Sequence, residues 1–189
     1  MKGFSLIELL ISISILAAIT VFTVTNLVSS PRNQELKSNA ADLASLFRKA
    51  QIWSLTGHQV NGQVPNGGYG LSIPACGTAP CKVRLFADLD GSLTYNSAGN
   101  LLGTPATNPT EEKIEELVLS KFVTVAPPGI GVDLLFKPPQ GLVCLYDTAS
   151  VQCPPASSNV IFALAGLGDY ASASFQVQVS TVSGQVTTQ

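Results

Sequence analysis

A long uncharged apolar run near the N-terminus limits the folds open to this chain. From Leu9 to Pro31 there are 23 consecutive positions without a charged residue, mostly aliphatic with interspersed Ser and Thr. As an α-helix rising 1.5 Å per residue, the run is about 35 Å long, and the hydrocarbon core of a bilayer is about 30 Å thick. The sequence therefore predicts a helix that crosses a membrane once.

A cleaved secretory signal peptide is the alternative interpretation of this run, because Met1-Lys2 supplies a charged start. The apolar region of a signal peptide spans roughly 7–15 residues and ends in a small-residue cleavage site. This run is longer, and Glu8 lies in its first turns. Because a carboxylate that faces lipid is costly, a charge at this position indicates a functional role.

The first eleven residues, MKGFSLIELLI, resemble the processing signal of type IV prepilins and type II secretion prepseudopilins. In that family a short basic leader ends in Gly, and prepilin peptidase cuts after the Gly and methylates the new N-terminal residue. The resemblance implies that residues 1–3 are the leader, that Gly3 precedes the cut and that Phe4 becomes the methylated N-terminus.

The same resemblance implies a role for Glu8 in subunit assembly. In a fibre of bundled helices, Glu8 of one subunit neutralises the N-terminal ammonium of Phe4 in its neighbour. Two charges that are costly alone in lipid become tolerable when they are paired. The implied partners are prepilin peptidase and other major and minor (pseudo)pilin subunits. The alternative is an ordinary membrane anchor that carries a glutamate by chance.

The chain divides into a leader (1–3), a transmembrane half of the helix (4–30), an amphipathic half (31–57) and a β-rich domain (58–189). In the amphipathic half, apolar residues recur at steps of three or four, which places them on one helix face. These residues are Leu36, Ala40, Leu43, Phe47, Ala50 and Trp53. Gly57 is expected to end the helix.

Short alternating runs separated by Gly and Pro predict an antiparallel β domain after residue 57. The predicted strands cover 83–87, 117–125, 132–136, 142–146, 160–164 and 173–179. Residues 113–117 equally suit a short helix. Asp90-Gly91 is a hairpin signal, and turns are expected at 67–70, 127–129 and 138–141. The predicted fold class is α+β and pilin-like, with a long N-terminal transmembrane and amphipathic helix packed on a sandwich-like antiparallel sheet domain.

Four cysteines form two local pairs in the sequence, Cys76/Cys81 and Cys144/Cys153. Four cysteines allow three pairings. In an exported domain they usually form disulfides, and the prolines beside each pair favour the local pairing. A zinc site built from all four is the alternative, although the spacings match common zinc sites poorly.

The composition argues against an enzyme or a cofactor site. Charged residues make up 12% of the chain, about half the usual share of roughly 25%, and there is one His. The segment Asp88-Leu89-Asp90-Gly91-Ser92 suggests a calcium loop. Because its twelfth position is Gly99 rather than a glutamate, an acidic hairpin turn is favoured and no metal is predicted.

Within the β-rich domain the resemblance narrows to the GspH/FimT family, which comprises H-type minor pseudopilins of type II secretion and minor pilins of type IV pili. The segments that carry it are 85–91, 134–141 and 177–186. It implies a structural subunit that is first a single-pass protein of the bacterial inner membrane, with its domain outside the cytoplasm, and later part of a pseudopilus or pilus. The alternatives are a DNA-binding minor pilin for natural transformation and an unrelated membrane-anchored periplasmic domain.

Charge separates the structural role from the DNA-binding one. DNA-binding minor pilins of this family carry a C-terminal Gly-Arg-x-Arg motif, and the matching stretch from Gly184 to Thr187 is Gly-Gln-Val-Thr. From Phe122 to the C-terminus there is one cation, Lys137, against three aspartates. Nucleic acid is therefore not a favoured partner. A basic patch would require the fold to gather Arg48, Lys49, Lys82 and Arg84.

Overall fold

The computed structural model describes residues 5–60, 62–76, 80–95, 113–126, 131–147, 150–166 and 174–189, with backbone alone at 22–32, 126 and 147. The chain divides into two compact units, Met1–Glu35 and Leu36–Gln189. One helix, α1 (Leu6–Thr56), contributes to both units.

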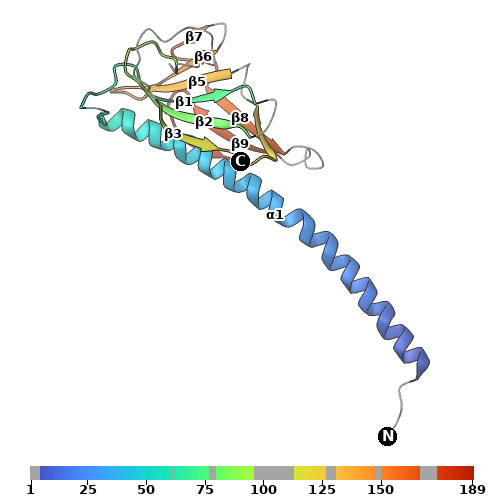
Figure 1. Ribbon diagram of the computed structural model, residues 1–189. Helices are drawn as coiled ribbons and strands as arrows, with labels where there is room; N and C mark the ends of the chain where they lie inside the picture. Colours follow the sequence, from blue (N-terminus) through green and yellow to red (C-terminus); the bar gives the residue numbers. More distant parts are fainter. Residues whose placement is uncertain are drawn as a thin grey trace. The chain divides into compact units, whose positions relative to one another are not determined.

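The second unit is built from short strands. Their bounds are β1 (Gly68–Pro74), β2 (Lys82–Asp88), β3 (Lys113–Val118), β4 (Val123–Ala126), β5 (Gly131–Lys137), β6 (Leu142–Asp147), β7 (Val151–Gln152), β8 (Asn159–Gly166), β9 (Ser174–Ser180) and β10 (Val186–Thr188). They form a six-stranded sheet in the order β3-β2-β1-β5-β6-β7 (Figure 1) and a four-stranded sheet in the order β10-β9-β8-β4. Neighbouring strands in both sheets pair antiparallel, which confirms the predicted α+β class.

The buried face of α1 packs against both sheets in one core. Leu36, Ala40, Leu43, Phe47 and Ala50 are buried in it, as their spacing predicts. The core also takes in alternate residues of strands from both sheets, β1, β2 and β5 of the larger one and β8 and β9 of the smaller one among them. The amphipathic pattern in the sequence is therefore the packing surface of the helix.

Polar contacts fix the C-terminal end of α1 on the domain. The Ser54 hydroxyl donates a 2.5 Å hydrogen bond to the Phe136 carbonyl of β5, and the Arg48 guanidinium donates to the Val186 carbonyl of β10. The helix ends where expected, because Gly57 has a φ of +63°, a conformation that side chains disfavour.

The predicted strand over 117–125 is wrong, because the chain turns within it. β3 ends at Val118 in the six-stranded sheet and β4 begins at Val123 in the four-stranded sheet, so the turn carries the chain from one sheet to the other. The Ser120 N–H donates to Asn39 Oδ1 of α1, which fixes this crossing against the helix. Residues 113–117, which suit a helix or a strand on sequence alone, form most of β3.

The predicted turn at 67–70 is also wrong, because Gly68 and Gly70 lie inside β1. A Cβ at Gly68 would lie 2.1 Å from the Phe136 carbonyl oxygen, and one at Gly70 would lie 2.6 Å from that of Leu134. These glycines therefore let β5 approach β1 closely.

Two other turns predicted from the sequence have different outcomes. Residues 138–141 form the turn between β5 and β6. Asp90-Gly91 does not form a two-residue hairpin, because β2 and β3 are separated by residues 89–112. The predicted turn at 127–129 lies outside the described residues, as does the start of the predicted strand at 173.

Candidate functional site

The processing signal is only partly within the described residues. Gly3 and Phe4 lie outside them, and Glu8 is the third residue of α1, with an exposed side chain. Its backbone N–H donates to the Ser5 carbonyl at 3.0 Å, so it belongs to the first turn of the helix. A carboxylate in the first turn interacts favourably with the helix dipole. The side chain faces outward, where a second chain can reach it.

From Leu6 to Val21 the helix presents an apolar surface. Its large hydrophobic side chains are exposed: Leu6, Ile7, Leu9, Leu10, Ile11, Ile13, Ile15, Leu16, Ile19 and Val21. The hydroxyls of Ser12, Ser14 and Thr20 donate to carbonyls three or four residues earlier, at 2.8–2.9 Å. Because these polar groups are satisfied within the helix, this surface suits burial in an apolar environment.

Among the described residues, no helix combines the length and the apolar character that a membrane crossing requires. The predicted apolar run continues to Pro31, and its side chains from residue 22 onward lie outside the described residues.

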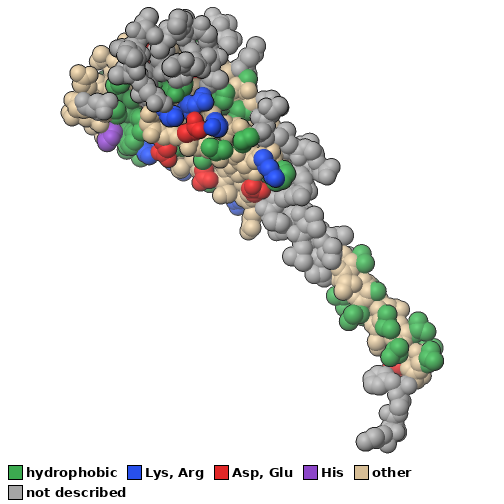
Figure 2. Space-filling model, in the orientation of Figure 1, with side chains coloured by type: hydrophobic (Ala, Val, Ile, Leu, Met, Phe, Trp, Pro, Cys, Tyr) green, Lys and Arg blue, Asp and Glu red, His purple; other side chains and the backbone are tan. Residues whose placement is uncertain are grey.

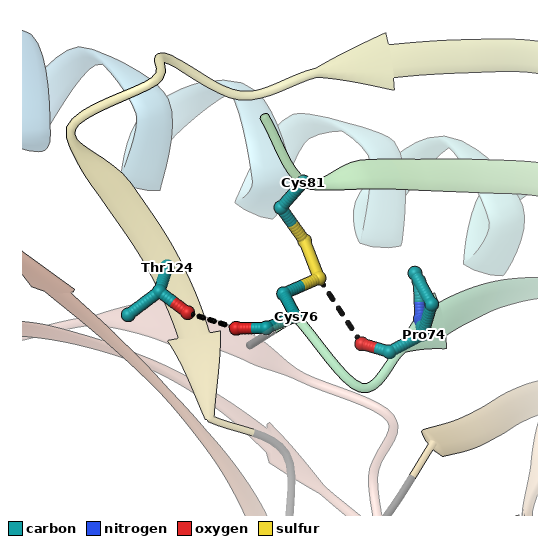
Figure 3. Close-up of a disulfide and its surroundings, with 4 residues drawn as sticks. All are labelled: Pro74, Cys76, Cys81 and Thr124. Atoms are coloured by element: carbon teal, nitrogen blue, oxygen red, sulfur yellow. Dashed lines mark hydrogen bonds between the residues drawn. A yellow bond between two sulfur atoms is a disulfide. The ribbon is translucent and has the colours of Figure 1, made fainter. Parts of the chain in front are cut away.

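The cysteines are paired locally. Cys76 and Cys81, with Cα atoms 5.5 Å apart, link the end of β1 to the start of β2, and Cys144 and Cys153, 4.4 Å apart, link β6 to the segment after β7. Thr124 of β4 donates a 2.6 Å hydrogen bond to the Cys76 carbonyl (Figure 3). The first disulfide therefore lies where β4 of the four-stranded sheet contacts the end of β1 in the six-stranded sheet. This arrangement supports disulfides over a zinc site.

The acidic segment after β2 is built as a structural loop. Asp88 is 0% exposed, and its carboxylate accepts hydrogen bonds from the N–H groups of Gly91, Ser92 and Leu93 at 2.7–3.1 Å. Burial raises the pKa of Asp88 to about 6. Within the described ranges, no group of three or more His, Cys, Asp or Glu side chains is placed to hold a metal. The carboxylate oxygens of Asp88 and Asp90 instead accept hydrogen bonds from backbone N–H groups of the loop.

The fold gathers three of the four candidate DNA-binding cations beside β3. Lys49 pairs with Glu115 at 2.5 Å, and Lys82 and Arg84 both pair with Glu116 at 3.2 Å. The hydrogen bond from Lys82 lowers the pKa of Glu116. Figure 2 shows basic and acidic side chains lying side by side on this face. The result is a mixed-charge surface rather than a basic patch.

Sequence reasoning missed the residues that hold the loop after β2 on the sheet. The Tyr95 N–H donates a 2.8 Å hydrogen bond to Asp133 of β5, and the Tyr95 ring packs 5.5 Å from that of Phe86. The one available signal was Asp133 itself, a charged residue among the apolar residues of β5.

Comparison with known proteins places the N-terminus in a recognised class. Residues 1–24 match the family model described as the prokaryotic N-terminal methylation motif. This motif is the signature of type IV pilins and pseudopilins, and it indicates a type IV pilin-like protein that prepilin peptidase processes. No curated protein and no solved structure matches the chain.

Proposed function

We propose that the protein is a structural minor pilin or pseudopilin that assembles into a type II secretion pseudopilus or a type IV pilus. Prepilin peptidase removes residues 1–3 and methylates Phe4, and Glu8 pairs with the N-terminus of a neighbouring subunit. The methylation motif at residues 1–24 carries this proposal. The GspH/FimT resemblance of the domain supports a minor rather than a major subunit.

The surface of α1 supports membrane anchoring before assembly. Its exposed aliphatic side chains and internally bonded hydroxyls match what a lipid environment requires. In this proposal the protein is anchored in the inner membrane before assembly, with its domain outside the cytoplasm. The same helix surface then packs against other subunits in the fibre.

Processing gives the direct test of the proposal. Protein extracted from membranes that contain the matching prepilin peptidase is expected to lack Met1-Lys2-Gly3 and to carry one extra methyl group on Phe4, measured by intact mass and peptide sequencing. A Gly3→Ala variant is the control, and it should stay uncleaved. An uncleaved wild-type chain, or one cut near Ala18, would support the unrelated anchored domain or a secretory signal instead.

A DNA-binding minor pilin is the second candidate, because the fold gathers Lys49, Lys82 and Arg84. Each of these cations lies beside a glutamate, which offsets its attraction for phosphate. In a fluorescence titration at physiological salt, the processed protein is therefore expected to show no duplex binding at micromolar concentrations.

A Glu115→Gln, Glu116→Gln double variant is the matched comparison for this titration. It frees the three cations and should bind more tightly, with a steeper dependence on salt, than the unsubstituted chain. Micromolar or tighter binding by the unsubstituted protein that weakens steeply with added salt would instead establish the DNA-uptake role.

A further inference from the structure

Two carboxylates converge on the backbone of the loop that follows β2. Asp88 Oδ1 accepts the Gly91 N–H at 2.7 Å, and Asp88 Oδ2 accepts the Leu93 N–H at 2.8 Å. The Ser92 N–H lies 3.1 Å from Asp88 Oδ1 and 2.8 Å from Asp90 Oδ1. Because one N–H faces both carboxylates, two like charges are held close together whenever the loop is closed.

The Asp88 carboxylate is enclosed by the sheet as well as by the loop. The Gly67 N–H donates to the Asp88 carbonyl at 3.0 Å, and a Cβ on Gly67 would lie 1.6 Å from Asp88 Oδ2. The carboxylate therefore lies directly over the backbone of Gly67 and is shielded from water. Opening the loop would return it to solvent.

A third carboxylate, that of Asp133, holds the far end of the loop. Tyr95 is 3% exposed, its N–H binds Asp133 Oδ2, and its ring contacts Phe86 and the Arg84 guanidinium. Phe86 and Tyr95 belong to a small cluster on the face of the sheet opposite α1. Between the two anchors, Leu93 has a φ of +64°, a strained conformation for a side-chain-bearing residue.

We propose that the loop Leu89–Tyr95 is a proton-operated latch, in which Asp88 and Asp90 share one proton when the loop is closed. Acid then tightens the loop on the outer face of the six-stranded sheet, and a rise to neutral pH loosens it. When the latch is closed, the loop is held in one conformation on this face of the sheet. When the latch is open, the loop is mobile there.

The direction of the pH response follows from proton linkage. Burial raises the pKa of Asp88 to about 6 and outweighs the hydrogen bonds from the Leu93 and Gly91 N–H groups, which lower it, while the neighbouring Asp90 raises it further. In an open loop the solvated carboxyl returns to its ordinary pKa of about 3.9. The closed state therefore binds a proton more tightly, so closure is favoured at low pH and lost as the pH rises through 6. Between pH 5 and pH 8 the opening equilibrium should rise by about tenfold.

The other charged groups near the latch do not reverse this direction. Asp133 faces Arg84 of β2, Ser72 of β1 and the Tyr95 N–H, and burial raises its pKa too. Glu116 of β3 lies beside Arg84, but its pKa is lowered, so it is ionised across this range. Burial therefore shifts the pKa of Asp133 in the same direction as that of Asp88.

Amide hydrogen exchange of the full chain in detergent micelles, followed by NMR, tests the latch. Protection factors, which are corrected for intrinsic exchange rates, should fall about tenfold at Gly91 and Leu93 between pH 5 and pH 8. Those of Val83 and Leu85 within β2 should not change. The Asp90→Asn variant should show a smaller fall, because the like charge is gone and the burial of Asp88 alone still raises the pKa of its carboxyl. The exposed-site control, Asp42→Asn, should show the fall seen in the unsubstituted chain.

Three results would overturn the proposal. The first is protection of Gly91 and Leu93 that does not depend on pH. The second is an equal fall in the Asp90→Asn variant, which would show that the carboxylate pair is not the sensor. The third is recovery of protection at pH 8 when calcium chloride is added, which would make the loop a cation site.

Discussion

Replacing Glu8 by Gln is expected to remove the protein from the fibre without changing how its domain folds. In the proposed fibre this carboxylate neutralises the Phe4 ammonium of a neighbouring subunit in an apolar helix bundle. Breaking a buried ion pair by removing one partner costs about 3–5 kcal/mol, so incorporation should fall by at least about 100-fold. The domain is unaffected, because Glu8 lies in the first unit and its side chain is exposed.

The assembly experiment compares variants that are all cleaved and methylated normally. Sheared fibres and membranes are separated and the protein is quantified by immunoblotting, with intact mass used to confirm cleavage and methylation. Glu8→Asp keeps the charge and should retain part of the incorporation. Asp42→Asn removes an exposed carboxylate from the second unit and should incorporate normally. Normal incorporation of Glu8→Gln would show that charge pairing does not drive assembly of this subunit.

Periodicity made the helix and five of the ten described strands predictable, namely β2, β5, β6, β8 and β9. The spacing of Leu36, Leu43 and Phe47 follows the α-helical repeat, and each of them is buried in the core. Alternation likewise predicted β9, where Val177 and Val179 are buried and the intervening Gln178 is not. These patterns could be recognised because each depends on residues close together in the chain.

Features that depend on distant residues were not predictable. Nothing local to Leu117–Val125 shows that the chain changes sheets there, because the contact that fixes the turn comes from Asn39. Gly68 and Gly70 are typical turn residues, and the reason for their small size inside a strand is the β5 backbone.

The candidate site likewise has one part that local sequence predicts, the processing motif, and one part that depends on distant residues, the loop after β2. The processing motif is a contiguous stretch that eleven residues suffice to identify, and the family model covers the same stretch. The loop after β2 resembles a hairpin or a calcium loop on sequence alone, because Asp88 and Asp90 do not reveal that Gly67 and Asp133 come close to it. Contacts with residues distant in the sequence therefore determine the conformation of this acidic loop.

Truncating Phe47 to Ala is expected to destabilise the domain far more than truncating an exposed residue of the same helix. The Phe47 side chain is 0% exposed, and its ring stacks on that of Phe162 in β8 at a centroid distance of 5.0 Å. Removing it leaves a cavity where α1 meets the four-stranded sheet. Phe→Ala changes in a core cost about 3–5 kcal/mol, and in a domain of this size that lowers Tm by about 10 °C.

Thermal unfolding of the full chain in detergent, followed by the near-ultraviolet circular dichroism of the domain, measures this loss. Ile52→Ala is the matched control, because Ile52 lies on the same helix and is 56% exposed. Its Tm should change by less than about 2 °C, since a surface substitution usually alters stability by about 0.5 kcal/mol or less. Equal shifts for the two variants would mean that the Phe47 face of α1 is not packed on the sheet, and the description of the helix as part of the domain core would fail.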